Sequence, residues 1–149
     1  MSKMKTFTGR LVSDNNAENQ DTIHLSGGDS STCYRIHKLE LISTSEHADI
    51  GAVVKIYQNY QNIVTEVIDF KEDALLGAAI YRQDTGNNYP LSTVVTFDNE
   101  VFNQDIFITY KDNETSSSQI NYLLVLEEIK VKDAELAVVN YSAALLHGE

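Results

Sequence analysis

The residue types most often used in catalysis and metal binding are few in this sequence and unsuitably spaced. The four histidines are His24, His37, His47 and His147, and no two of them have a spacing typical of metal ligands. The single cysteine, Cys33, precedes His37 by four residues, which on one strand is roughly 13 Å and too far for a nucleophile–base pair. A lone cysteine also forbids an internal disulfide and excludes zinc sites built on two or four cysteines.

Acidic residues are abundant, but none of them forms a recognisable site. The segment Asp14–Glu18 resembles the opening of a calcium loop, yet Asn19 and Leu25 stand where an EF-hand needs Gly and Glu. The later acids that could share a cation between subunits are Asp98, Glu100, Asp105 and Asp112. The phosphate-loop pattern GxxxxGK[ST] and the serine-hydrolase pattern GxSxG are both missing from the sequence. We therefore expect no enzymatic activity, no metal and no cofactor.

The net charge of the chain disfavours two classes of partner. The 149 residues include 22 Asp and Glu against 11 Lys and Arg, a formal net charge of −11. Nucleic acids and anionic membranes are bound through an excess of Lys and Arg, so we expect neither as a partner. No apolar run reaches membrane-spanning length, and the N-terminus lacks the apolar region of a secretory signal. The expected site of synthesis is the cytoplasm.

Basic residues gather at the N-terminus. Lys3, Lys5 and Arg10 are the charged residues among the first ten, whereas the other 139 residues hold 8 bases and 22 acids. We expect these three bases, together with Leu145 and Leu146 near the C-terminus, to belong to arms that dock on a neighbour. The C-terminal arm fits docking on its own domain as well as docking on another molecule.

The elements that must position these residues are predicted to be β-strands. Val, Ile and Thr total 35 residues, and such side chains suit a pleated, half-buried surface. The expected strands are Lys5–Val12, Thr22–Leu25, Tyr34–Ser43, Ala52–Gln58, Ile63–Phe70, Leu75–Tyr81, Ser92–Phe97, Phe102–Lys111 and Ile120–Val131. Of these, Leu75–Tyr81 fits a helix as well as a strand. Hairpin turns are predicted at Asn59–Asn62 and Asp98–Glu100.

Strands of this number and spacing predict an all-β fold. We expect a single β-sandwich that is jelly-roll-like, with an Ig-like sandwich as the alternative. The sandwich is expected over residues 6–132, with an N-terminal arm over residues 1–5 and a C-terminal arm or short helix over residues 133–149.

Alternation along two strands predicts which residues face the core. One face of the segment before the last loop holds Ile106, Ile108 and Tyr110. One face of the last strand holds Ile120, Tyr122, Leu124 and Leu126. The opposite face of that strand is also apolar, so we expect it to be covered by a loop or to face another subunit.

Several stretches of the chain carry a resemblance to a known class of proteins. They are YRIHKLELIS, VVKIYQ, VIDFKEDALLGAAIYRQD, NNYP and FDNEVFNQDIFITYKD, together with the opening from Phe7 to Leu25. They resemble small virion structural proteins of tailed phages, especially T-even-like phages of marine cyanobacteria. The likeness spans about Thr6 to Val131 and is most specific over Phe97–Ile106.

The resemblance implies a function without a catalytic motif. It implies a capsid decoration, or cement, protein. We expect such a protein to bind the major capsid protein and neighbouring copies of itself, with a trimer as the expected oligomer. The expected location is the exterior of the virion. The alternative is a neck-, tail- or fibre-associated protein that binds a receptor or glycan, with Tyr60, Tyr81 or Tyr89 in exposed loops. An enzyme such as a cell-wall hydrolase would instead need a pocket with convergent acids.

Overall fold

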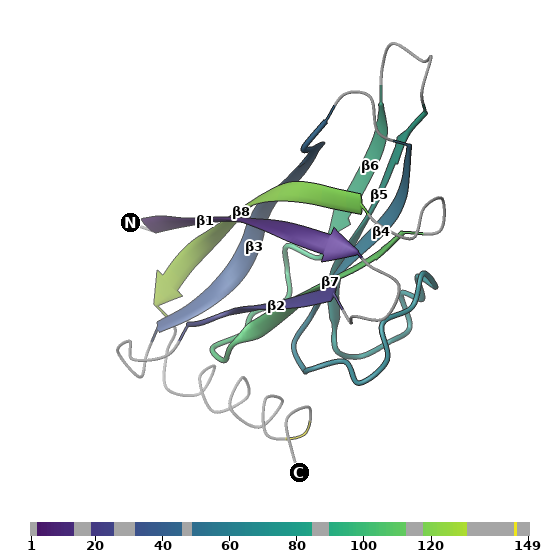
Figure 1. The fold of residues 1–149 in the computed structure, drawn as a ribbon. Coiled ribbons are helices and arrows are strands. Elements are labelled where there is room, and N and C mark those ends of the chain that lie inside the picture. The colour runs from purple at the N-terminus through teal and green to yellow at the C-terminus, as the bar shows by residue number, and fades with distance from the viewer. Residues whose placement is uncertain are drawn as a thin grey trace.

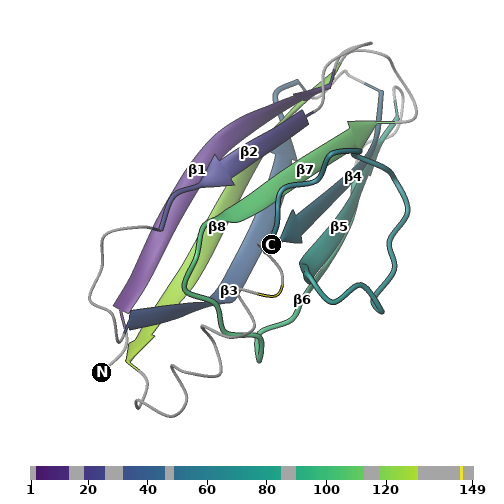
Figure 2. The same cartoon turned by 90° about the horizontal axis from the view of Figure 1, so that it is seen from below.

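The chain folds into two antiparallel β-sheets that pack face to face (Figures 1 and 2). The computed structural model describes residues 3–13, 19–25, 32–45, 49–84, 90–112 and 118–130, together with Leu145. The strands are β1 (Lys3–Ser13), β2 (Asn19–Ile23), β3 (Thr32–Ser43), β4 (Ile50–Tyr57), β5 (Leu75–Gln83), β6 (Leu91–Thr96), β7 (Ile106–Asp112) and β8 (Ser118–Lys130). One sheet has the order β1-β8-β3, and the other has the order β2-β7-β4-β5-β6.

The strand pairing is nested in the manner of a jelly roll. β1 pairs with β8, β2 with β7 and β4 with β5, so the first half of the chain runs antiparallel along the second half. The fourth nested pair, β3 with β6, does not form, and β6 pairs with β5 instead. The prediction of an all-β sandwich is confirmed. The strand order is jelly-roll-like and differs from the Ig-like alternative, whose sheets follow another order.

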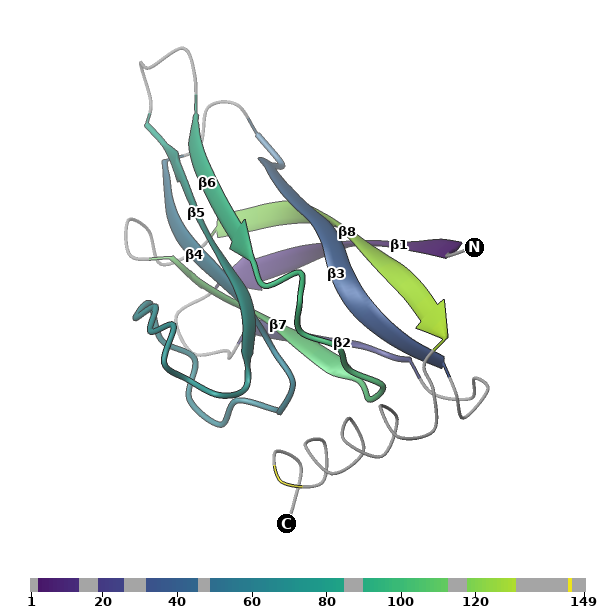
Figure 3. The same cartoon turned by 180° about the vertical axis from the view of Figure 1, so that it is seen from behind.

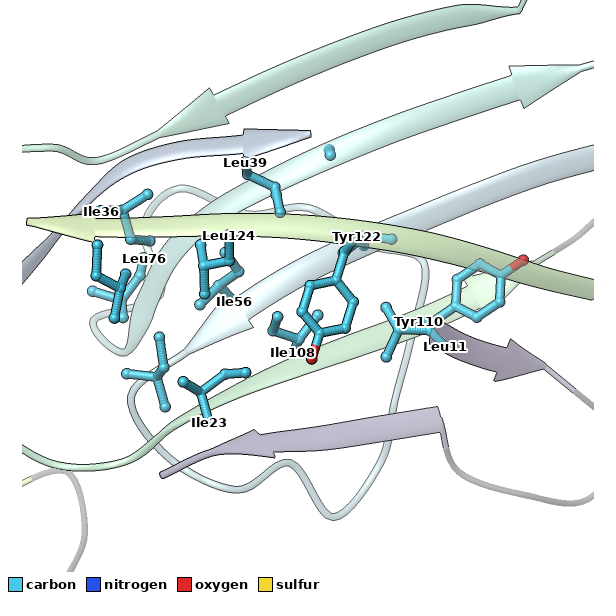
Figure 4. Packing of buried hydrophobic residues seen from close by; sticks show 14 of the residues in the cluster. Leu11, Ile23, Ile36, Leu39, Ile56, Leu76, Ile108, Tyr110, Tyr122 and Leu124 are labelled. Atoms are coloured by element: carbon cyan, nitrogen blue, oxygen red, sulfur yellow. The ribbon is translucent and has the colours of Figure 1, made fainter. Parts of the chain in front are cut away.

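The core lies between the two sheets, and the predicted inward faces are confirmed (Figure 4). The three β7 residues expected on one face, Ile106, Ile108 and Tyr110, have no exposed surface. The four β8 residues expected on one face are buried as well, the most exposed being Tyr122 at 6%. The Tyr122 ring lies over Gly9, its partner on β1, where an added Cβ would stand 2.6 Å from the ring. This close approach explains the glycine in the middle of an edge strand.

The predicted strand Ile63–Phe70 is wrong. These residues lie in the connection of residues 58–74 between β4 and β5, which we call the strap. The segment is rich in β-branched residues, as strands are, but β5 and β7 already occupy both edges of β4. A hairpin at Asn59–Asn62 therefore has no free edge of β4 to extend, and Ile63 is exposed.

The hairpin predicted at Asp98–Glu100 is also wrong. β6 pairs with β5, whereas β7 lies between β2 and β4, so the two strands flanking this turn are not neighbours. The second strand begins at Ile106 rather than Phe102. Phe102 instead forms an isolated bridge to Tyr34, with N···O distances of 2.7 Å and 2.9 Å. The segment Leu75–Tyr81, left open between helix and strand, is a strand within β5.

The structure describes the N-terminal segment from Lys3 onward, whereas after Lys130 it describes Leu145. β1 begins at Lys3 and pairs with β8 from that residue on, so Lys3 to Lys5, expected in an arm, belong to the sheet. β8 is long enough to supply Glu128, Glu127 and Leu126 as their partners. The predicted C-terminal arm lies outside the described residues except for Leu145. Among the described residues, no helix is long and apolar enough to cross a membrane.

Candidate docking surface

The solvent side of the three-stranded sheet is the candidate docking surface. Leu11, Leu124 and Leu39 point into the core, so their neighbours along each strand point outward. We call these outward residues the outer face. They are Met4, Thr6, Thr8, Arg10 and Val12 from β1, Asn121, Leu123, Val125 and Glu127 from β8, and Arg35, Lys38, Glu40 and Ile42 from β3.

The outer face carries more apolar side chains than a solvated sheet face usually shows. Leu123 and Val125 lie on the central strand and are half-buried. Met4 is 50% exposed, Val12 37% and Ile42 65%. The two apolar faces of β8 therefore have different environments: one is in the core, and the other retains accessible surface for a partner.

The charge of the outer face is opposite to the charge of the chain. It holds three bases and two acids, whereas the whole sequence holds twice as many acids as bases. Glu127 forms an ion pair with Arg35, and Glu40 accepts a contact of 3.2 Å from Lys38 Nζ. Both acids are thus paired within the face, which leaves Arg10 as its net positive charge. An acidic partner would meet a small net positive charge on this face.

Two of the residues predicted to form docking arms, Lys5 and Arg10, lie on opposite sides of β1. Arg10 is exposed on the outer face. Lys5 lies on the other side of β1, where its Nζ is 3.8 Å from Glu128 and 5.6 Å from the centre of the Tyr34 ring. Lys3 is exposed at the start of the same strand. Leu145 is 67% exposed, and Leu146 lies outside the described residues.

The structure separates Cys33 from His37. Both residues lie on β3, but Cys33 is fully buried whereas His37 is exposed. Burial raises the pKa of the Cys33 thiol, which lowers the fraction of reactive thiolate. This environment is that of a structural cysteine.

We expect Cys33 to react with a thiol reagent such as DTNB only when the protein unfolds. The rate in native buffer is expected to be about a thousandfold below the rate in denaturant, since reaction requires opening of β3. A native rate within about tenfold of the denatured rate would contradict the buried placement of this side chain.

The acids considered as cation ligands are also apart. Asp105 precedes β7, where it accepts hydrogen bonds from the Leu25 amide at 2.8 Å and from His24 Nδ1 at 3.2 Å. Asp112 ends the same strand, roughly 20 Å away, and accepts from the Gly51 amide. Over the described residues, no three His, Cys, Asp or Glu side chains are grouped to hold a metal ion. The segment Asp14–Glu18 lies outside the described residues.

Two of the tyrosines proposed for glycan binding, Tyr60 and Tyr81, have opposite environments. Tyr81 was expected in an exposed loop, but it lies on β5, is 2% exposed and donates a hydrogen bond to Gln83. This prediction is wrong because the Tyr81 side chain lies on the inward side of β5, in the core between the two sheets. Tyr60 is 55% exposed and contacts the edge of Phe107, while Tyr89 lies outside the described residues.

A buried lysine beneath the strap has no counterpart in the sequence predictions. Lys55, on the outward side of β4, is 2% exposed, and its Nζ donates to the Val67 carbonyl at 2.6 Å and to Thr65 Oγ1 at 3.2 Å. Burial lowers the pKa of this ammonium, and the nearby carboxylates of Glu72 and Glu66 oppose the shift. The lysine therefore fastens the strap to the five-stranded sheet. Its only sequence signal is one charge within the apolar run AVVKIY.

Two further contacts hold the strap across the same sheet. The Gln20 side chain on β2 donates to the Gln61 carbonyl and accepts from the Gln61 amide, both at 2.9 Å. At the other end, Phe70 contacts the edge of Phe97 at 5.0 Å between ring centres. The strap thus covers the part of the five-stranded sheet around Lys55 (Figures 1 and 3). Further along the same side, Ile80 on β5 is 48% exposed and Val95 on β6 is 39% exposed.

Comparisons with known proteins give little further information. No known protein family matches the chain, and no curated protein matches it. A solved structure with detectable similarity is the crystal structure of the Yersinia pseudotuberculosis-derived mitogen. It is 18% identical, 89% of each chain is covered, and the TM-score is 0.28. The assignment of the fold rests on the strand pairing described above.

Proposed function

We propose that this chain is a non-enzymatic virion structural protein that decorates a capsid through the outer face of its three-stranded sheet. The observation that carries the proposal is the combination of accessible apolar residues and net positive charge on one face of a strongly acidic protein. The sequence resemblance to small phage virion proteins supplies the class of partner, a major capsid protein.

The charge distribution supports assembly on a pre-built lattice. Free copies at −11 repel one another, which keeps them apart in solution. An acidic shell surface would attract the outer face while the acidic remainder points to solvent. Each copy needs only an interface of standard size, because many copies on one particle act together.

Reversing the charge of Arg10 tests the face directly. We expect Arg10→Glu to weaken binding to undecorated capsids by about tenfold at low salt, with a smaller effect at high salt. Lys71→Glu is the matched control, because Lys71 is an exposed base on the strap, away from the outer face. Binding is measured by co-sedimentation of purified protein with capsids. Equal loss in the two variants would contradict docking through the outer face.

The number of copies on the particle tests the position. A decoration protein should be present in roughly hundreds of copies, as measured by quantitative mass spectrometry of purified virions. About six or twelve copies would favour the neck or tail, and absence from the particle would overturn the virion assignment altogether.

A further inference from the structure

One side of the sandwich is open because β3 and β6, the fourth pair of a jelly roll, do not pair with each other. In the nested order β3 would lie beside β6, but β6 pairs only with β5 among the described strands. β3 and β6 are therefore the facing edges of two different sheets (Figure 3). A groove of about 380 Å³ lies there, and its lining includes Leu39, Leu41, Ser92 and Val94.

The groove has closed ends and an open middle. At one end, the Tyr34 backbone is bridged to Phe102. At the other, the Ser43 amide lies 3.4 Å from the Tyr81 hydroxyl, and Ser43 Oγ donates to Gln83. Between these points the described part of the chain supplies no strand partner for the edge of β3. Edge strands carry unpaired N–H and C=O groups, so β3 and β6 both present backbone hydrogen-bonding groups along the opening.

We propose that this groove binds an extended segment of a partner polypeptide, which adds as a fourth strand to β3 over Leu39–Ile42. The segment would supply the backbone pairing that β6 does not give to β3. Its inward side chains would be aliphatic and alternate in sequence, because Leu39, Leu41 and Val94 form the inner wall.

Two features favour another polypeptide over a second copy of this chain. Copies at −11 repel one another. The β3 edge also has a bulge between Ile36 and Lys38, and bulges and lysines are devices that protect an edge from indiscriminate pairing. The strand is regular again from Lys38 onward, so the unprotected part of the edge coincides with the groove. This inference is independent of the location on a virion.

The test uses the full chain and a capped synthetic heptapeptide, Lys-Ile-Thr-Ile-Thr-Ile-Lys. We expect saturable binding below about 1 mM by NMR titration, with amide shifts over Leu39–Ile42 and Ser92–Val94. A peptide of the same composition with its three isoleucines adjacent should bind at least about tenfold more weakly, since its side chains no longer alternate. N-methylation of alternate residues should weaken binding by a similar factor, because it removes backbone donors.

Neighbouring residues on β6 supply matched variants. Ser92 lines the groove, whereas Thr93 is exposed and points to the other side of the strand. We expect Ser92→Arg to weaken peptide binding at least about tenfold and Thr93→Arg to change it by less than about twofold.

Three results would overturn the proposal. One is no saturable binding up to about 1 mM. Another is equal binding of the N-methylated peptide, which would make the groove an apolar hollow without strand addition. The third is dimerisation through β3 seen by sedimentation without peptide, which would make a second copy the occupant.

Discussion

We expect the free energy of unfolding to fall by several kcal/mol between pH 10 and pH 12. Tyr57, Tyr110 and Tyr122 each have a pKa raised from 10 to about 12 in the folded protein. Burial is the main cause for all three, since none of these side chains is more than 6% exposed. A shift of this size corresponds to about 3 kcal/mol for one group.

Nearby carboxylates add to the shifts. Glu72 lies beside Tyr57, and its charge and hydrogen bond raise the pKa further. Asp21 does the same for Tyr122, whose hydroxyl donates to it at 3.4 Å. For Tyr110 the hydrogen bond with Ser118 lowers the pKa and Asp112 raises it.

The direction of the effect follows from proton binding in the two states. Well below pH 10 these tyrosines are protonated in both the folded and the unfolded state, so the stability does not change with pH on their account. Between pH 10 and 12 the unfolded chain loses these protons while the folded chain keeps them, so stability falls as the pH rises. Burial lowers the pKa of Lys55 in the folded protein, so its contribution to stability rises with pH. One lysine opposes three tyrosines, so we expect the net stability to fall.

Urea unfolding from neutral pH to about pH 11.5 measures the effect, and tyrosinate absorbance follows the ionisation. Tyr122→Phe should remove about a third of the alkaline slope. If all eight tyrosines ionise near pH 10 while the circular dichroism stays native, the burial argument fails.

Replacing Lys55 should have the second large effect. We expect Lys55→Ala to lower the free energy of unfolding by about 3 kcal/mol, because it empties a buried position and removes the donor to the Val67 carbonyl. The strap should loosen first, so amide exchange at Gln61 should accelerate by at least about tenfold.

Two comparison variants separate charge from volume. Lys55→Met keeps most of the side-chain stem and should lose about 1 to 2 kcal/mol less than Lys55→Ala. Lys71→Ala, at an exposed base on the same strap, should change stability by less than about 0.5 kcal/mol. Unchanged exchange at Gln61 in Lys55→Ala would show that the lysine does not hold the strap.

The alternation of apolar residues correctly predicted which side chains point inward on β7 and β8. The inward residues of β7 and β8 follow from period-2 alternation, because successive side chains of a strand point to opposite faces. The strand prediction for Ile63–Phe70 rests instead on β-branched residues beside a turn, and it fails because both edges of β4 are already paired. A strand needs a partner as well as a pattern, and the sequence of one segment does not state which edges are free.

The candidate docking surface was only partly predictable. Arg10 was expected to take part, and it lies on the outer face. The grouping of Arg10 with Leu123, Val125 and Ile42 was not expected, because these residues are far apart in sequence and meet only through the order β1-β8-β3. The prediction of Tyr81 as an exposed ligand contact is wrong for a related reason, since its side chain lies on the face of β5 that the other sheet covers.

Composition and spacing alone determined that this protein is an acidic all-β chain with one unpaired cysteine, and that alternating apolar residues line its core. These properties are local, because they depend on side-chain type and on the two-residue period of a strand. Tertiary structure alone decided which strands are neighbours. The order of the strands buried Lys55 under the strap and left the edge of β3 without β6 as a partner. It also gave the outer face a small net positive charge in a chain whose net charge is −11. Strand order is set by long-range pairing across the whole chain, so no single segment encodes it.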